Sequence, residues 1–507
     1  MSVALTGNDL TFAELDAVAL EEASVSLAPD SIARMSASRA VVDKLVADGH
    51  TAYGINTGFG KLASVRISSE QVRQLQINLV RSHACGVGTP LSESETRAMI
   101  LLRANALAKG LSGVRPVVVE TLCQMLNNGV HPVIPSQGSV GASGDLAPLA
   151  HLAQVVIGEG EAIYKRERLL GREALERAHI LPVTLEAKEG LSLLNGTQGM
   201  LALLSLALRE ADMLADTADV AAALSLDALR GSPGAFDARI MHARAYPGAG
   251  TTARNLAHLN EGSQIRESHR APEKDRRVQD AYSLRCTPQV HGAVRDCLAQ
   301  ARETARVELN SATDNPLVFV KEGGRGDIVS GGNFHGQPLA MAADNLAIAI
   351  ATLGGISERR VEQMTNPLTS LLPAFLSPDP GLNSGFMIVQ VTAAALTSEN
   401  RALATPHSVD SISTSGNQED YVSMGMSAAR RLERMLANLR HILASELLCA
   451  CQGIDLLAPL ETGSLARKAL TAVRLLSPKV AADRPLAPDV NAVAELISSG
   501  AIAKILH

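Results

Sequence analysis

The sequence contains no tryptophan, and aromatic residues make up only 2% of its 507 residues. Proteins that bind single-stranded nucleic acid stack the bases on aromatic side chains, and nucleic-acid-binding domains carry an excess of lysine and arginine. Here 52 acidic residues outnumber 46 basic ones, and the formal net charge is −6. We therefore do not expect nucleic acid to be a partner.

Long uninterrupted apolar runs are also missing. The two most apolar windows, residues 190–208 and 338–357, are interrupted by Asn, Gln, Asp or Gly. A transmembrane helix needs about 20 predominantly apolar residues. We therefore expect both windows to form buried helices, and we do not expect a membrane to be a partner.

Paired cysteines and a secretory signal are not evident either. The six cysteines are scattered, and none forms a Cys-x-x-Cys pair. The first residues lack the basic segment followed by an apolar segment that is typical of a signal peptide. Unpaired thiols in such a chain indicate a reducing compartment. We therefore expect a cytoplasmic protein.

Strand-like alternation of polar and apolar residues is rare, and the best candidate is a hairpin at 314–332. Apolar residues recur instead at helical spacing, as Val72, Leu75 and Leu79 do within residues 69–83. A hydrophobic content of 46% allows a large core. The sequence predicts a mainly α protein with long central helices, some apolar on nearly every face. Such helices are expected at 200–230, 287–310, 336–365, 385–405 and 422–453.

Motifs of several common enzyme classes are incomplete. A nucleophile elbow requires Gly-x-Ser-x-Gly, but Asp145 occupies the last position after Ser143, and no strand precedes it. Gly60 and Lys61 lack the upstream glycine and the following Ser or Thr of a P-loop. The histidines show no His-Glu-x-x-His or other metal-ligand spacing. These patterns do not indicate a serine hydrolase, a nucleotide-binding enzyme or a metal enzyme.

Short glycine-rich polar segments lead directly into apolar helices at residues 141–145, 195–199 and 331–337. Helix N-termini carry a partial positive charge and unpaired N–H groups. If these ends converge, they form an electropositive pocket that suits a carboxylate or an electrophile. Ordinary helix capping is the alternative explanation.

Two further polar segments carry reactive side chains. Residues 51–61 place Tyr53 in a glycine-rich loop. Gln279, Tyr282 and Arg285 are spaced three residues apart, which puts them on one helical face. An arginine fork binds a carboxylate in two-point fashion, and a tyrosine near cations can act as a base. A surface loop or a capped helix is the alternative for each segment.

Together these segments resemble the histidine/phenylalanine ammonia-lyase family from about residue 5 to the C-terminus. The resemblance rests, in family order, on TAYGINTGFG, NLVRSHACGVG, GSVGASGDLAPLAHL, KEGLSLLNGTQ, VQDAYSLRC, SATDNPLVF, SGGNFHGQP and SGNQEDYVSMG. It implies a single ammonia-lyase unit over 1–507, with a smaller mixed N-terminal part at 1–195 and a long-helix bundle at 196–507. It also implies a homotetramer whose active sites are shared between subunits.

In this family an Ala-Ser-Gly tripeptide, here Ala142-Ser143-Gly144, cyclises without another enzyme into 4-methylidene-imidazol-5-one (MIO). The amide nitrogen of Gly144 attacks the carbonyl of Ala142, and glycine has no Cβ to crowd that nitrogen. Ser143 supplies the oxygen that leaves. Asp145 matches an acid implicated in ring formation. The resemblance implies that the MIO electrophile takes up the substrate amine, and that neither pyridoxal phosphate nor a metal is required.

The resemblance also implies roles for residues around the tripeptide. Tyr53 matches a tyrosine opposite the MIO, and Tyr282 is the first candidate for the catalytic base, although the two can share that task. Arg285 is expected to bind the substrate carboxylate. The other expected site residues are Asn195, which stabilises the MIO, and Gln279, Phe334, His83 and Glu419, which line the pocket or contact the substrate.

His83 and Glu419 favour histidine as the substrate, since imidazole offers both a donor and an acceptor. The expected reaction is deamination of L-histidine to trans-urocanate and ammonia, a step of histidine degradation. Tyr421 departs from the histidine of many histidine-specific relatives, and some tyrosine-specific relatives share Ser82-His83. A tyrosine or phenylalanine ammonia-lyase, an aminomutase of the same family and a non-catalytic helical scaffold stay open as alternatives.

Overall fold

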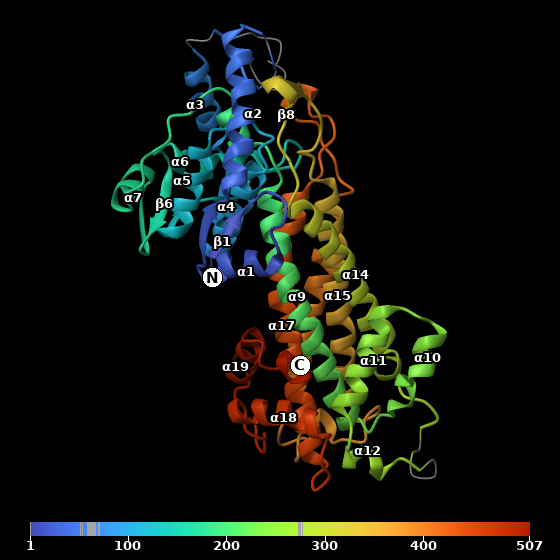
Figure 1. Ribbon diagram of the computed structural model, residues 1–507. Coiled ribbons are helices and arrows are strands. Elements are labelled where there is room, and N and C mark those ends of the chain that lie inside the picture. The colour runs from blue at the N-terminus through green and yellow to red at the C-terminus, as the bar shows by residue number, and fades with distance from the viewer. Residues whose placement is uncertain are drawn as a thin grey trace. The chain divides into compact units, whose positions relative to one another are not determined.

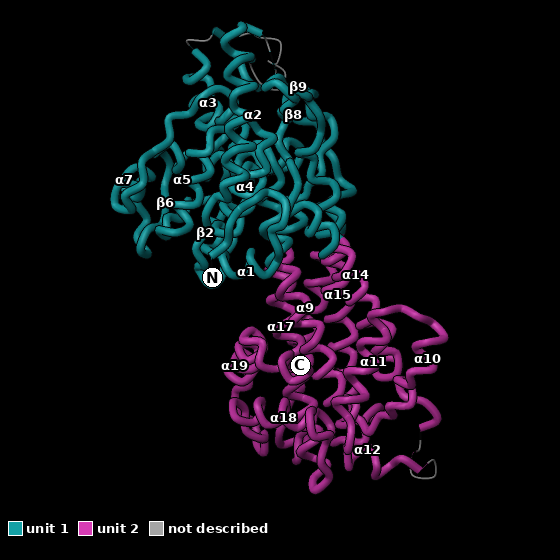
Figure 2. The backbone as a smooth tube through the Cα atoms, in the orientation of Figure 1, with its two compact units in different colours: residues 1–206, 302–344, 406–430 teal, residues 207–301, 345–405, 431–507 magenta. Residues whose placement is uncertain are grey.

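The computed structural model describes residues 2–50, 52, 54–57, 67–68, 71–271, 275 and 277–507. Helices dominate this part of the chain and the strands are short (Figure 1), which confirms the predicted mainly α fold. The chain divides into two compact units (Figure 2). Unit 1 comprises Met1–Leu206, Arg302–Asp344 and Pro406–Arg430, and unit 2 comprises Ala207–Ala301, Asn345–Thr405 and Arg431–His507.

Unit 1 is a mixed region in which helices pack with short strands. Its strands pair as β1 (Ser2–Leu5) with β2 (Ser24–Leu27), β3 (Val87–Pro90) with β5 (Pro135–Gln137), β4 (Val130–Pro132) with β6 (Glu161–Tyr164) and β7 (Glu167–Leu170), and β8 (Leu317–Val320) with β9 (Gly326–Val329). The antiparallel β8–β9 pair confirms the predicted hairpin. Its helices before the long bundle are α1 (Phe12–Leu20), α2 (Pro29–Ala47), α3 (Val72–His83), α4 (Glu93–Ala108), α5 (Pro116–Asn127), α6 (Leu146–Val156), α7 (Gly171–Arg177) and α8 (Glu189–Leu194).

Local sequence explains where several of these helices begin. Thr11 before α1 and Ser92 before α4 each form a capping box with a glutamate three residues later. Pro116 opens α5 at a position where its missing N–H costs nothing. All residues of α4 from Thr96 to Ala108 are buried, so α4 is a central helix of unit 1.

Four long helices contribute residues to both units: α9 (Gln198–Ala228), α14 (Thr287–Leu309), α15 (Gln337–Thr365) and α17 (Gly425–Leu456). Together with α16 (Met387–Leu403) they confirm the long helices that apolar periodicity predicts. Unit 2 also holds α10 (Ala238–Ala243), α11 (Pro247–Leu259), α12 (Gln264–Ser268), α13 (Tyr282–Arg285), α18 (Ser464–Leu476) and α19 (Ala487–Ser498). The short 3₁₀ helices are η3 (Pro233–Phe236), η4 (Glu322–Gly324), η5 (Ala374–Leu376), η6 (Ser415–Asn417) and η7 (Ala503–Leu506).

Helix α15 is long and apolar enough to cross a membrane by length and composition alone. Its most apolar window is 61% buried within the protein, and a core helix passes the same test. Leu339, Ala343 and Leu346 lie in that helix with almost no exposure. This burial agrees with the prediction that residues 338–357 form a core helix.

The two units interleave along the sequence, because Arg302–Asp344 and Pro406–Arg430 return to unit 1 after long excursions into unit 2. Segments far apart in sequence are thereby gathered around one part of unit 1. The predicted division into an MIO-bearing N-terminal part, 1–195, and a long-helix bundle part, 196–507, stays a prediction.

Candidate active site

Ala142, Ser143 and Gly144 form a bend that leads directly into α6. Gly144 bridges to Gly196, and the Asp145 amide donates a 2.7 Å hydrogen bond to the Gly196 carbonyl. Gly144 has a φ of +68°, and a Cβ there would lie 2.0 Å from the Gly196 oxygen. The folded backbone therefore requires glycine at position 144 before any chemistry takes place.

The residues just before the tripeptide are tied to two distant segments. The Gly141 carbonyl accepts hydrogen bonds from the Gly336 amide at 3.1 Å and from the Ser423 hydroxyl at 2.7 Å. The Met424 amide donates to the Val140 carbonyl at 2.9 Å. These contacts bring the loops before α15 and α17 against the bend.

Both polar groups of Ser143 are engaged by residues that the sequence predicts for the site. The Ser143 hydroxyl donates to Glu419 Oε1 at 3.0 Å, and Asn195 Nδ2 donates to the Ser143 carbonyl at 3.1 Å. Ala142 and Asn195 are buried, whereas Ser143 and Glu419 are half-buried. The Ser143 hydroxyl is thus hydrogen-bonded to the Glu419 carboxyl group, and Ser143 lines a cavity.

Asp145 is completely buried beside the tripeptide. Burial raises the pKa of its carboxyl to about 6, although hydrogen bonds from the Met200 amide and the Ser139 hydroxyl, both 2.8 Å long, oppose the shift. A carboxyl with such a pKa exchanges a proton near neutral pH. Asp145 is therefore suited to proton transfer next to Gly144.

A cavity of about 380 Å³ opens over the tripeptide, and its lining confirms that the three polar segments before helices converge. Of the predicted site residues, it is lined by Ala142, Ser143, Asn195, Phe334 and Glu419. The cavity is also lined by Tyr421, which the sequence marks as a departure from histidine-specific relatives, and by residues that the sequence did not single out, which are Leu191, Asn315, Ser330, Gly331, His335, Gln418 and Asp420. All of these lie in or beside the quoted family motifs, so proximity to a motif was the available signal. A larger hollow of about 980 Å³ lies among α10 and α11 and contains none of the predicted site residues.

One wall of the cavity includes Tyr421, which departs from the pattern of many histidine-specific relatives. Its ring stacks against His335 with the ring centres 6.1 Å apart. His335 Nε2 also lies 3.2 Å from the Tyr421 backbone oxygen. Tyr421 therefore has a packing role in this wall.

His83 ends α3, and its Nδ1 lies 2.9 Å from the Leu79 carbonyl. Because a carbonyl only accepts hydrogen bonds, Nδ1 carries the proton and Nε2 is left as an acceptor. Burial lowers the pKa of His83, while the negative charge of Glu419 opposes that shift. The imidazole is therefore neutral at pH 7, with Nε2 available to a donor.

Gln279, Tyr282 and Arg285 belong to unit 2. Tyr282 and Arg285 lie in α13, but Gln279 precedes that helix, so the prediction that all three share one helical face is wrong for Gln279. Tyr282 is 69% exposed and Gln279 is exposed, while Arg285 is half-buried. The Arg285 guanidinium lies 4.5 Å from the centre of the Tyr282 ring, a cation–π contact. Arg285 Nε donates to the Asp280 carbonyl at 3.1 Å. This edge of unit 2 thus presents a cation beside a phenol.

Tyr53 lies outside the described residues, and its role stays a prediction. Its neighbour Gly54 has a φ of +71°, and a Cβ there would lie 2.4 Å from Leu191 Cδ2. Leu191 lines the cavity. Gly54 is therefore packed against a residue that lines the cavity.

Within the described part of the chain, no group of three or more His, Cys, Asp or Glu side chains is placed to hold a metal ion.

Residues 10–475 match the aromatic amino acid lyase family. The chain is 57% identical over 510 residues to the histidine ammonia-lyase of Koribacter versatilis, covering 98% of each chain. Among solved structures it is similar to the histidine ammonia-lyase of Trypanosoma cruzi, with a TM-score of 0.91, 44% identity and coverage of 100% of this chain and 95% of that one. It is also similar to the tyrosine aminomutase of Streptomyces globisporus, with a TM-score of 0.94, 40% identity and coverage of 100% and 98%. The chain belongs to the aromatic amino acid lyase family.

Proposed function

We propose that this protein is a carbon–nitrogen lyase that converts L-histidine to trans-urocanate and ammonia with an MIO electrophile formed from Ala142, Ser143 and Gly144. The observation that carries the proposal is the arrangement at Ser143, whose hydroxyl contacts Glu419 and whose carbonyl accepts from Asn195. The 57% identity to a histidine ammonia-lyase over nearly the full length supports histidine as the substrate.

The residues around the tripeptide fit an MIO ring. Gly144 has no room for a Cβ, and without one nothing on this residue crowds its nitrogen. Asn195 Nδ2 already donates to the Ser143 carbonyl, which persists as the ring carbonyl after closure. Asn195 Oδ1 is buried with no hydrogen-bond partner in the described structure, so it is free to accept from a group that enters the cavity.

Ring closure needs no oxidant and no second protein. A bond forms between the Gly144 nitrogen and the Ala142 carbonyl carbon, and the carbonyl oxygen leaves as water with the protons of the Gly144 and Ser143 amides. The Ser143 hydroxyl then leaves as a second water with the proton of its own Cα. Asp145, buried with a pKa of about 6, is suited to relay these protons.

Once formed, the MIO supplies an electrophile that makes the substrate amine a better leaving group. Arg285 binds the substrate carboxylate through its planar fork. Tyr282, beside the Arg285 cation, removes the β-proton of the substrate, with Tyr53 as the second candidate for this base. Gln279 and Phe334 complete the pocket wall. Neither pyridoxal phosphate nor a metal is expected to take part.

The substrate imidazole is bound by His83 and Glu419. The neutral His83 ring offers Nε2 as an acceptor, and the Glu419 carboxylate offers a second one. These acceptors can receive an N–H of the substrate imidazole, which a phenyl ring lacks. This pairing favours histidine over phenylalanine and tyrosine.

We further propose a homotetramer in which active sites are shared between subunits. Helices α15 and α16 expose Met341, Ile348, Ile388 and Val391, each by 45% or more. Exposed apolar faces of this kind are typical of association surfaces. The exposed Tyr282 and Gln279 are suited to facing the site of another subunit. Cytoplasmic localisation stays a prediction.

An aminomutase is the second candidate, because the chain is 40% identical to a tyrosine aminomutase with a TM-score of 0.94. The two activities differ in their products. A lyase releases ammonia and the unsaturated acid, whereas an aminomutase returns the amine to the β-carbon.

Product analysis tests the proposal. Purified protein is incubated with L-histidine, and urocanate is followed by its ultraviolet absorbance while ammonia is assayed in the same sample. We expect both products in equal amounts. A β-amino acid in place of urocanate would establish the aminomutase. If L-histidine gives no product at all, the tyrosine or phenylalanine ammonia-lyase and the non-catalytic scaffold are the remaining alternatives.

A further inference from the structure

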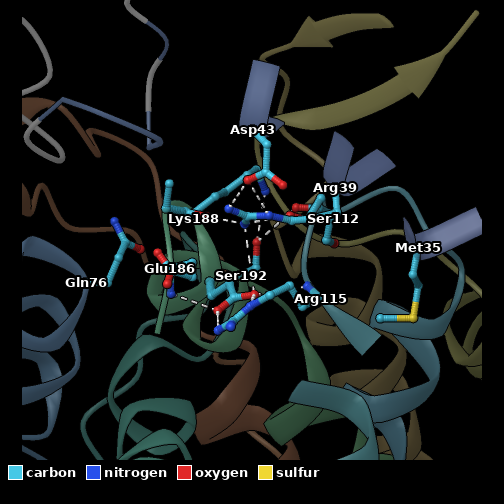
Figure 3. Close-up of polar contacts among 12 residues, drawn as sticks. Met35, Arg39, Asp43, Gln76, Ser112, Arg115, Glu186, Lys188 and Ser192 are labelled. Atoms are coloured by element: carbon cyan, nitrogen blue, oxygen red, sulfur yellow. Dashed lines mark hydrogen bonds and ion pairs between the residues drawn. The ribbon is translucent and has the colours of Figure 1, made fainter. Parts of the chain in front are cut away.

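Unit 1 contains a group of buried charges that the proposed chemistry does not use. We call Arg103, Lys188, Ser192 and Asp314 the α8 charge cluster, since they surround the helix that precedes Asn195. Lys188 and Arg103 are completely buried and Asp314 is almost so. Figure 3 shows Lys188 and Ser192 with Arg39 and Arg115 close by. Buried charges are costly unless they are paired, so their retention here requires an explanation.

Arg103, on α4, holds the backbone at the end of α8. Its Nη1 donates to the Asn195 carbonyl at 2.9 Å and to Gln198 Oε1 at 2.7 Å, and its Nη2 donates to the Ser192 carbonyl. A Cβ at Gly196 would lie 2.2 Å from Arg103 Nη1. The guanidinium therefore fixes the residues that carry the Asn195 side chain and the Gly196 carbonyl.

Those same residues contact the tripeptide directly. Asn195 donates to the Ser143 carbonyl, and the Gly196 carbonyl accepts from Asp145 and bridges Gly144. A shift in this backbone therefore displaces Ser143 and Gly144, two of the three residues that form the ring.

The Lys188–Asp314 pair of the α8 charge cluster is linked through Asn315 to another part of the cavity lining. Lys188 Nζ donates to Asp314 Oδ2 at 2.6 Å and to the Ser192 hydroxyl at 2.9 Å. Asp314 Oδ1 accepts from the Asn315 amide at 2.7 Å. Asn315 lines the cavity, and its Oδ1 accepts from the Gly331 amide at 2.7 Å.

The electrostatics of the cluster are mutually dependent. Burial lowers the pKa of Lys188, and the charge of Asp314 opposes that shift. Lys188 and Arg103 in turn keep the pKa of Asp314 low despite its burial. Arg103 Nε has no hydrogen-bond partner in the described structure, so the cluster is not arranged for the greatest number of hydrogen bonds.

We infer that Arg103 and the Lys188–Asp314 pair are positioning residues for ring closure, which hold Asn195 and Gly196 against Ser143 and Gly144. The inference rests on the proposed function. Attack of one backbone nitrogen on a carbonyl two residues away requires near-attack geometry, and a displacement of about 1 Å can cost roughly 100-fold in rate.

The test is the intact mass of Arg103→Lys, with the fraction of chains that have lost water followed over time after synthesis. Lysine keeps the charge but cannot donate to three acceptors in a plane. We expect ring closure to be roughly 10- to 100-fold slower than in the wild type. Chains retaining one or both waters should therefore accumulate. The matured fraction should keep the wild-type KM, because Arg103 does not touch the substrate.

Arg97→Lys is the matched control. Arg97 lies on the same helix, is almost completely buried, and donates to the Val18 and Leu126 carbonyls away from the tripeptide. Both variants are compared by thermal melting. A comparable loss of melting temperature with a defect in water loss only in Arg103→Lys supports positioning. Equal maturation of Arg103→Lys, Arg97→Lys and the wild type would overturn the inference.

Ser192→Ala and Asp314→Asn keep the inference testable if Arg103→Lys does not fold. The first removes one hydroxyl that accepts from Lys188 and donates to Asp314, and the second keeps the shape of Asp314 but not its charge. We expect slower water loss in both, and normal water loss in both folded variants would overturn the inference. A wild-type chain that loses no water would instead contradict the proposed function itself.

Discussion

The two units present their predicted site residues in different ways. In unit 1, Ser143, Asn195 and Glu419 are joined by hydrogen bonds around one cavity, and a shell of buried charges stands behind them. In unit 2, Gln279 and Tyr282 are exposed, just before and at the start of the four-residue helix α13. Arg285 is half-buried at the end of that helix. The residues of unit 1 are buried or half-buried around a cavity, whereas Tyr282 and Gln279 of unit 2 are exposed at its surface.

This difference follows from what each set has to do. Ring closure joins atoms of one short segment, so it needs a rigid backbone before any substrate arrives. Binding of a substrate carboxylate and removal of a proton need groups that the substrate can reach. Exposure of Tyr282 is therefore expected if it meets its ligand in an assembly of several chains.

The largest expected effect belongs to unit 1. Ser143→Ala removes the hydroxyl that leaves during ring formation, so the electrophile cannot form and almost no activity should remain. The intact mass of the wild type should be two waters below the sequence mass, and this deficit should be absent in the variant. The variant should keep the wild-type oligomeric state. A wild-type mass equal to the sequence mass would contradict the MIO assignment.

Tyr282→Phe tests the role of a unit 2 residue in catalysis separately from ring formation in unit 1. A positioned acid or base contributes roughly 10²- to 10⁴-fold to rate, so kcat should fall within that range. The mass deficit should be unchanged, because Tyr282 takes no part in ring closure. Tyr164→Phe, which alters a half-buried tyrosine of unit 1 that does not line the cavity, is the control. Wild-type kcat in Tyr282→Phe would move the base to Tyr53.

Arg285→Lys tests whether the guanidinium of Arg285 binds the substrate carboxylate. Hydrogen bonds to a charged group contribute about 1.5–3 kcal/mol, so kcat/KM should fall roughly 10- to 100-fold. Arg244→Lys is matched, since Arg244 also lies over a tyrosine ring in unit 2, 5.0 Å from the centre of Tyr246. The control should keep wild-type kinetics. Equal losses in both variants would mean that a general effect on unit 2, and not carboxylate binding, is being measured.

The smallest expected effect concerns specificity. His83→Leu removes the neutral imidazole whose Nε2 can accept from the substrate ring. Turnover of histidine should fall by about tenfold or more while the ratio for phenylalanine and tyrosine improves. The mass deficit should persist. Unchanged ratios between the three substrates would remove His83 from the specificity site.

Much of this organisation could be predicted from the sequence because it is local. Helical periodicity predicts the long helices, and the glycine-rich segments before α6, α9 and α15 mark the positions that line the cavity. The tripeptide itself is recognisable because it lies in the family motif GSVGASGDLAPLAHL.

The remainder depends on long-range contacts that a linear pattern does not encode. Asn315 and His335 line the cavity only because their segment folds back onto unit 1. Arg103 and Lys188 look like ordinary solvent-exposed charges in the sequence, since lysine and arginine are rarely buried completely. Their burial and their contacts with the residues around Asn195 become visible only in three dimensions.

The most direct test of the central claim is a competition experiment with the wild-type protein. Equal concentrations of L-histidine, L-tyrosine and L-phenylalanine are mixed with the enzyme, and the three unsaturated acids are quantified together. A site with polar groups for imidazole should reject analogues that lack its nitrogens by about 10⁴-fold, so urocanate should be the dominant product. Coumarate or cinnamate as the main product would contradict histidine as the substrate and leave the ammonia-lyase chemistry intact.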